Sequence, residues 1–259
     1  MTLAHPAYGQ LRQVTPTASV LLADNPGKMT LDGTNTWILR APGGEDVVVV
    51  DPGPKDSEHL DAVAATGNVV LTLVTHRHKD HTGGLKKFHK KTGAPIRALS
   101  EDYVYAGTPL LDGEVIDVAG LKITVLATPG HTADSLSFVL DDAVLTGDTI
   151  LGRGTTVLDP KDGTLADYLS SLDRLEAVGE GKVALPGHGA EVADAAEVVR
   201  FYRKHRLERL AQVKAALDEI GQNAKPMQVV KHVYSDVDKK LWPAARMSVK
   251  AQLTYLREN

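Results

Sequence analysis

The sequence contains no cysteine among its 259 residues. This absence excludes disulfide bonds, thiolate metal sites and a cysteine nucleophile, and it is typical of a cytoplasmic protein. A transition metal would therefore have to be bound by histidine and carboxylate side chains. Aromatic residues are also scarce, at 5%, which gives little support for a surface that stacks nucleic-acid bases.

No apolar run approaches the roughly 20 residues that cross a bilayer. The opening residues, MTLAHPAYGQLRQVTP, lack the basic and apolar regions of a secretory signal. Hydrophobic residues make up 42% of the chain and charged residues 24%, which is ordinary for a folded protein. The sequence therefore predicts a cytoplasmic protein without a membrane segment, long enough for one large domain and a small second one.

The net charge of −4 hides an uneven distribution along the chain. Residues 200–259 hold 13 Lys/Arg against 6 Asp/Glu, a balance of +7, whereas residues 1–199 carry −11. A basic tail on an acidic body indicates that the tail could meet an anionic partner such as single-stranded RNA. Helix surfaces rich in Lys and Arg for solubility alone would give the same balance.

Short β-branched runs bounded by turn residues predict a strand-rich first domain over residues 1–195. Helical patterns interrupt these runs around residues 56–65, 83–91 and 164–178. Such a mixture predicts an α/β domain with sheets packed on each other and helices outside. The expected strands are ASVLLAD, NTWILRA, DVVVVD, VVLTLVT, PIRALS, EVIDVAG, LKITVLATP, SLSFVL, DAVLTGD and KVALPG.

Residues 196–259 change to helical spacing and predict a small second domain of three helices. The break GQNAKP separates the first of them from two more, in MQVVKHVYSD and DKKLWPAARMSVKAQLTYLREN. Asp238 is expected to cap the last helix, with Pro243 in its first turns. The arrangement resembles a helix-turn-helix unit, but too few residues follow the third helix to form a β wing.

Apolar strand-like runs lead directly into five of the ten histidines. VLTLVT precedes a cluster with the pattern His-x-His-x-Asp-His, and ITVLATPG, KVALPG and AVLTG each precede a further His or Asp. Ligands at several strand ends can converge on one rim of a sheet. The candidate metal ligands are His76, His78, Asp80, His81, His131, Asp148 and His188.

This residue set suits a metal centre of two ions. Neutral imidazole and carboxylate bind Zn²⁺ at about 2.0–2.2 Å. Five histidines and two aspartates are too many for one tetrahedral zinc, but they suit two metals that share a carboxylate and a hydroxide. The sequence therefore predicts two Zn²⁺ ions, and Mn²⁺ or Fe would also suit these ligands.

The motif series resembles the metallo-β-lactamase superfamily, which implies an α/β fold: an αβ/βα sandwich of two mixed sheets with metals at one edge. By this resemblance His76, His78 and His131 hold one metal, Asp80, His81 and His188 hold the other, and Asp148 bridges. The resemblance also makes Asp51, in VVVVDPG, an aspartate that orients metal ligands; a plain turn after a strand is the alternative.

The segments DGTNTWIL, ILGRGTTVL, LADYLSSLDRL and LPGHGAEV resemble the β-lactamase-like protein 2 group over nearly the whole chain. Members of that group carry a small winged-helix-like C-terminal domain, and they include a zinc-dependent endoribonuclease acting on single-stranded RNA. This chain departs from the group because it lacks room for a full wing. The departure puts nucleic-acid recognition by that element in doubt.

These observations give one reaction type and several substrates. A metal-held hydroxide would attack an ester, thioester, lactone, amide or phosphodiester, with Asp80 orienting it and taking up its proton. The first expectation is an endoribonuclease on single-stranded RNA, in which Arg77, Lys79 and Arg153 would contact phosphate. The alternative is a thioester or lactone hydrolase, similar to glyoxalase II, acting on a small acyl substrate. A third hypothesis is a metal- or ligand-sensing DNA-binding protein, and the tail would also suit a homodimer contact.

Overall fold

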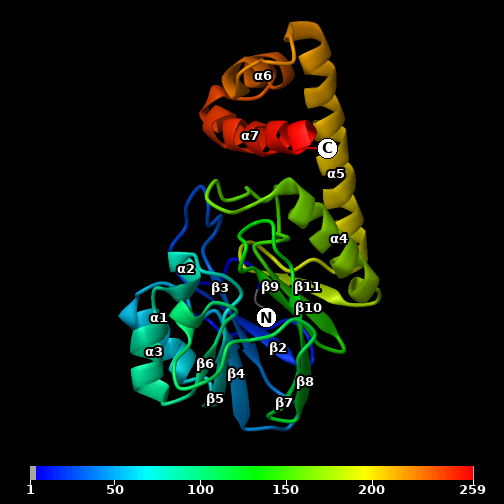
Figure 1. Cartoon of the computed structure of the whole chain (residues 1–259). Coiled ribbons are helices and arrows are strands. Elements are labelled where there is room, and N and C mark those ends of the chain that lie inside the picture. Colours follow the sequence, from blue (N-terminus) through cyan, green and yellow to red (C-terminus); the bar gives the residue numbers. More distant parts are fainter. Residues whose placement is uncertain (1–3, 259) are drawn as a thin grey trace.

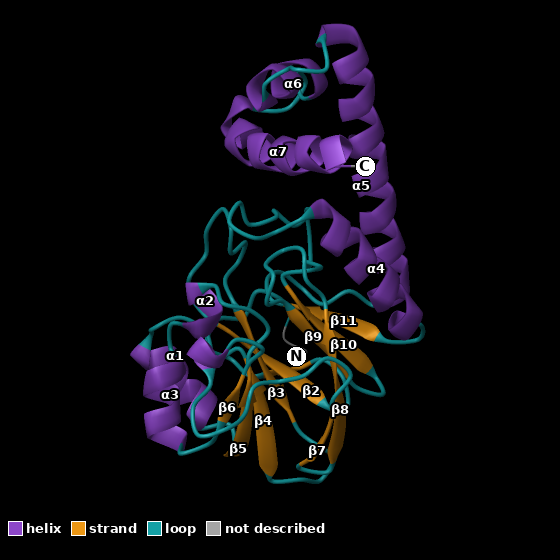
Figure 2. Cartoon of the chain, in the orientation of Figure 1, coloured by secondary structure: helices purple, strands orange, loops and turns teal. Residues whose placement is uncertain are grey.

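The computed structural model of the protein describes residues 4–258 and contains two facing β-sheets flanked by helices (Figures 1 and 2). Apolar side chains from both sheets fill the space between them and form the main core. This is the two-sheet sandwich with outer helices that the sequence predicts. No helix among the described residues is long and apolar enough to cross a membrane.

The first sheet has six strands in the order β1-β2-β3-β4-β5-β6. Its first four strands pair antiparallel, whereas β4, β5 and β6 are parallel. The consecutive valines of β4 are buried on both faces, because Val48 and Val50 face the main core while Val47 and Val49 face outer helices. The strands are β1 (Arg12–Gln13), β2 (Ala18–Leu22), β3 (Asn35–Leu39), β4 (Asp46–Val50), β5 (Asn68–Leu73) and β6 (Ile96–Arg97).

The second sheet has five strands in the order β11-β10-β9-β8-β7. Its pairs are antiparallel except β10 with β11. Both sheets are thus mixed, as expected. The strands are β7 (Val115–Val118), β8 (Leu121–Ala127), β9 (Leu136–Val139), β10 (Ala143–Gly147) and β11 (Val183–Pro186).

Helices cover the outer faces of both sheets. Helices α1 and α3 lie beside the first sheet, and α4 and the start of α5 lie beside the second (Figure 1). The helices are α1 (Ser57–Ala64), α2 (Lys79–Thr82), α3 (Leu85–Thr92), α4 (Leu165–Gly179), α5 (Ala195–Ile220), α6 (Pro226–Val233) and α7 (Trp242–Glu258), with 3₁₀ turns at Glu101–Tyr103 and Lys239–Leu241.

Helix α5 extends beyond the sandwich and carries α6 and α7, and α7 folds back over the loops at the upper edge of the sheets (Figure 1). These three helices share a small core of their own, which includes Val213, Val229 and Val249. Residues 196–258 contain helices and no strand. The domain boundary after residue 195 stays a prediction; helix α5 begins there and packs along α4.

Most predicted elements occur within one or two residues of their expected ends. The sequence missed β1, because a two-residue strand carries no periodic signal. The pattern predicted around residues 83–91 is split into α2 and α3 by Gly83 and Gly84. Asp238 accepts a hydrogen bond from the Lys240 amide and so caps the turn that leads into α7, with Pro243 in the first turn of that helix.

Buried His59 gives the fold a pH dependence that can be tested. Its Nε2 lies 2.9 Å from Thr36 Oγ1, whose hydroxyl donates to the Asp51 carbonyl, so His59 is the donor in this pair. Burial lowers the pKa of His59 from 6.5 to about 4. The unfolded chain therefore binds this proton more readily, and folding stability is lost as the pH falls from 6.5 towards 4. When the pH is lowered from 7.5 to 5, this histidine should lower the free energy of unfolding by about 2 kcal/mol.

The measurement is urea unfolding of the wild type and His59→Gln at these two pH values. We expect the variant to lose about 2 kcal/mol less than the wild type on acidification. His232→Gln is the matched control, since His232 is exposed; it should keep the wild-type difference. Equal losses in the wild type and His59→Gln would show that His59 does not carry this dependence.

Candidate metal centre

The predicted ligand residues converge at one edge of the sandwich because each follows the end of a strand. His76 comes shortly after β5 of the first sheet, and His78 is the cap residue of α2, which carries Asp80 and His81. The second sheet supplies the rest: His131 follows β8, Asp148 follows β10 and His188 follows β11. All seven predicted ligands therefore meet where the carboxyl ends of strands from both sheets come together.

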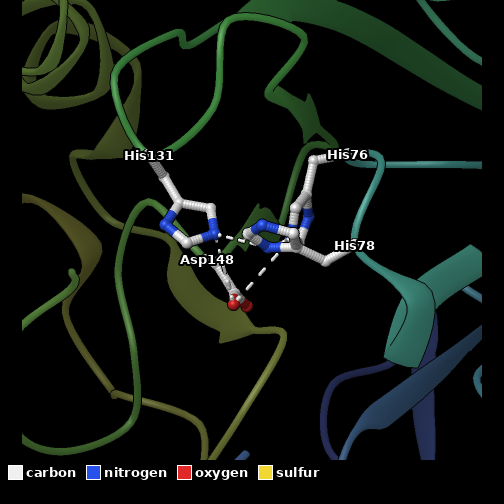
Figure 3. A group of neighbouring side chains, drawn as sticks. All are labelled: His76, His78, His131 and Asp148. Carbon is white, nitrogen blue, oxygen red and sulfur yellow. Dashed lines mark hydrogen bonds and ion pairs between the residues drawn. The ribbon is translucent and has the colours of Figure 1, made fainter. Parts of the chain in front are cut away.

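Three imidazole nitrogens and one carboxylate form the first group (Figure 3). His78 Nδ1 lies 3.1 Å from His76 Nε2 and 3.0 Å from His131 Nε2. Asp148 Oδ2 lies 3.9 Å from His76 Nε2 and 3.7 Å from His131 Nε2. Donor atoms at the corners of a tetrahedron with metal bonds of 2.0–2.1 Å would be about 3.4 Å apart. The spacing therefore fits a metal ion.

A second group adjoins the first through Asp148. His188 Nε2 lies 3.3 Å from His81 Nε2, 3.1 Å from Asp80 Oδ2 and 3.3 Å from Asp148 Oδ2. Asp148 thus faces both groups, and its Oδ1 is buried without a hydrogen-bond partner. A buried carboxylate oxygen without a partner is costly unless a cation meets it. The two groups form a His/Asp cluster for a dinuclear metal site.

Each histidine of the cluster has its other ring nitrogen held by the protein. His78 Nε2 lies 2.9 Å from Asp159 Oδ2, and His81 Nδ1 lies 2.8 Å from Asp51 Oδ2. Two other histidines donate to backbone carbonyls: His131 Nδ1 to Val157 O, and His188 Nδ1 to Gly33 O. Such hydrogen bonds fix the tautomer of each imidazole and would direct its other ring nitrogen towards a bound metal.

Asp51 lies behind the cluster, where the resemblance places it. Besides His81, its carboxylate accepts hydrogen bonds from the backbone amide and the hydroxyl of Thr75. Because the Thr75 hydroxyl donates to Asp51, its oxygen accepts the proton of His76 Nδ1 at 3.0 Å. Asp51 thus orients two histidines, one directly and one through Thr75.

The charges of the cluster call for cations at its centre. Burial lowers the pKa of His76 and His131, so these rings are neutral ligands. Burial opposes protonation of His188 too, yet Asp148 and Asp80 raise its pKa to about 9. The pKa of His81 is raised for the same reason. The attraction of Asp51, Asp80 and Asp148 for its proton is stronger than the opposing effect of burial. Metal ions would supply this positive charge in place of the protons.

The three residues predicted to contact phosphate, Arg77, Lys79 and Arg153, lie in different surroundings. Arg77 lies near the cluster, but its guanidinium contacts Asp159 at 2.8 Å, Asp162 at 3.1 Å and Asp134 at 3.5 Å. Arg153 is exposed and paired with Asp32. Lys79 is exposed at the start of α2.

Sequence reasoning missed Asp159 as a partner of His78 and Arg77. It lies in the irregular segment between β10 and α4, away from any strand end, so no motif marked it. The carbonyl partners Gly33 and Val157 carry no residue-type signal at all. These groups are found only from the course of the loops in space.

A two-sheet sandwich with a His/Asp cluster for two metals at one edge defines a metal-dependent hydrolase. The chain belongs to the metallo-beta-lactamase superfamily, which residues 29–188 match. Residues 226–259 match the beta-lactamase associated winged helix domain. Helices α6 and α7 therefore belong to a type of domain that accompanies this hydrolase fold.

Known proteins similar to this chain include two named kinds of relative. An atrochrysone carboxyl ACP thioesterase of Aspergillus chevalieri is 34% identical over 84% of this chain and 71% of its own length. A beta-lactamase-like protein 2 homolog of Caenorhabditis elegans is 31% identical over 95% of this chain and 86% of its own. The resemblance to the latter group that the sequence indicates is thus confirmed.

The fold also matches a solved structure over nearly its full length. The alignment with a metallo-beta-lactamase family protein of Thermus thermophilus covers 94% of both chains, with a TM-score of 0.75 and 24% identity. The match extends through the C-terminal helices as well as the sandwich.

Proposed function

We propose that this chain is a thioester hydrolase that acts on an acyl substrate, with the His/Asp cluster holding two Zn²⁺ ions. When bound, the ions polarise the carbonyl and lower the pKa of a water molecule. In this proposal Asp80 orients that water and takes up its proton; its side chain is 25% exposed and so open to solvent, while those of His81 and His188 are at most 1% exposed. The attack releases a thiolate. A thiol has a pKa of about 8.5, so the sulfur can leave without a proton donor.

The charge beside the cluster carries this proposal. Asp134, Asp159 and Asp162 surround the single guanidinium of Arg77, so this cation beside the cluster is already neutralised within the protein. A phosphodiester backbone gains little from a cation that is already paired, whereas a thioester is neutral at the reacting carbonyl and needs no such cation. The thioesterase named among the relatives supports the same substrate class.

The basic C-terminal tail was the sequence feature that favoured RNA as the substrate. Many of its cations contact other groups of the protein. Arg203 pairs with Asp173 of α4 at 3.0 Å, and Arg200 lies 3.7 Å from Glu176. Arg206 is buried, bonds the Thr156 carbonyl and lies over the Tyr168 ring. These arginines hold α5 against the sandwich and do not form a free basic surface.

Cleavage of single-stranded RNA is the second candidate. One observation favours it: exposed cations on α6 and α7 contact no carboxylate among residues 4–258. In that case the winged helix domain would gather the RNA backbone, and binding would weaken steeply with salt. These cations are Lys231, Arg246, Lys250 and Arg257.

The test compares the two substrates on one preparation whose metal content has been measured. Hydrolysis of butanoyl and octanoyl N-acetylcysteamine thioesters is followed by thiol release, and fluorescent single-stranded RNA is followed by gel. We expect thioester turnover and intact RNA. Cleavage of RNA without thioester turnover, suppressed by raised salt, would contradict the proposal and establish the second candidate.

A further inference from the structure

A cavity of 270 Å³ lies between the hydrolase domain and the C-terminal domain. Its floor comes from residues 158–166, which are the end of the connection from β10 and the first residues of α4, and its opposite wall comes from α7. The course of α7 over this part of the sandwich is visible in Figure 1. The cavity therefore exists only because the two domains meet.

The inner wall of the cavity is apolar. Leu158 and Leu165 are buried in the hydrophobic core beneath the cavity, and Ala251 and Tyr255 of α7 pack against the same core. Met247 adds an unbranched side chain that adapts its shape readily. Polar residues such as Lys250 and Glu258 are exposed and mark the rim. An apolar interior with a polar rim suits a hydrocarbon chain that enters from solvent.

The cavity comes near the metal cluster at His78, through Asp159, which lines it. The side chain of His78 is 33% exposed, whereas those of His76 and His188 are each 1% exposed, so a substrate reaches the cluster at His78. Asp159 lines the cavity and contacts His78 Nε2 at 2.9 Å. One residue thus separates the apolar space from a ligand histidine.

We propose that this cavity seats the apolar acyl chain of the substrate, so that α7 forms one wall of the active site. The inference rests on the thioester hydrolysis proposed above and adds to it a preference for medium-length chains. The acyl carbonyl lies at the cluster and the chain extends past Asp159 towards Met247 and Ala251. Each buried methylene should raise kcat/KM about fourfold until the cavity is full.

The first experiment measures kcat/KM for thioesters from butanoyl to dodecanoyl with metal-loaded, full-length protein. We expect the wild type to favour octanoyl over butanoyl by roughly 250-fold, since octanoyl has four more methylenes. Ala251→Leu adds an isopropyl group to the inner wall and should reduce this ratio at least about tenfold. Met247→Ala enlarges the cavity and should move the preference to longer chains. Ala215→Leu, the same change at an exposed site on α5, should keep the wild-type ratio.

A binding measurement separates this inference from the proposed function. Octyl N-acetylcysteamine thioether cannot be hydrolysed, and its binding is followed by calorimetry. Binding to the wild type that is weakened at least about tenfold by Ala251→Leu supports the cavity even if no thioester is hydrolysed, in which case only the proposed function fails. Thioester turnover with a flat chain-length profile, or an unchanged profile in both cavity variants, would overturn the inference and leave the hydrolase standing.

Discussion

Replacement of Asp148 by asparagine should lower kcat/KM by more than about a thousandfold, because the metals supply several kcal/mol of transition-state stabilisation. Asp148 Oδ2 lies within 3.3–3.9 Å of a nitrogen on three histidines, His76, His131 and His188, which belong to both ligand groups. The amide keeps the size of the side chain but removes the charge that both metal positions share. The measurements are thioester turnover and elemental analysis, and the metal content should fall below that of the wild type.

The control is Asp141→Asn, which removes the same charge from an exposed turn between β9 and β10. It should keep both turnover and metal content. Circular dichroism and the melting temperature show whether either variant has lost the fold. Full turnover by folded Asp148→Asn would rule out a carboxylate shared by the two metals.

The convergence of the candidate ligand side chains was predictable because each follows the end of an apolar run. A strand that is buried on both faces is a continuous β-branched sequence, as in β4, and its end can be read to within a residue. A histidine or aspartate at that position must lie at the edge of the sheet. His131, Asp148 and His188 needed no knowledge of how the sheets face each other.

The second set of contacts was not predictable, because it depends on how irregular segments cross in space. Asp159 reaches Arg77 and His78 from a loop that lies 82 and 81 positions further along the sequence, respectively. The charge of the C-terminal tail also could not be interpreted from the sequence alone. A sequence allows cations to be counted, but it does not show that Arg203 and Arg206 already have partners on the sandwich.

Replacement of Gly130 by alanine should destabilise the protein by about 3 kcal/mol or more and weaken metal binding. Gly130 has a φ of +130°, which side chains rarely adopt, and a Cβ atom there would lie 2.5 Å from the Tyr168 backbone nitrogen in α4. Backbone strain and overpacking each cost about 1–3 kcal/mol. The melting temperature should therefore fall by about 6–12 °C.

Metal binding should weaken because Gly130 immediately precedes His131. Helix α4 is held to this loop by Ser171, which donates to the Pro129 carbonyl, so any shift that relieves the clash also moves the histidine. Gly181→Ala is the matched control: its φ is +69° and no atom lies within 4 Å of the new Cβ. It should cost about 1 kcal/mol and leave metal content unchanged. Equal losses of stability in the two variants would mean that backbone conformation alone, and not the contact with α4, requires glycine at position 130.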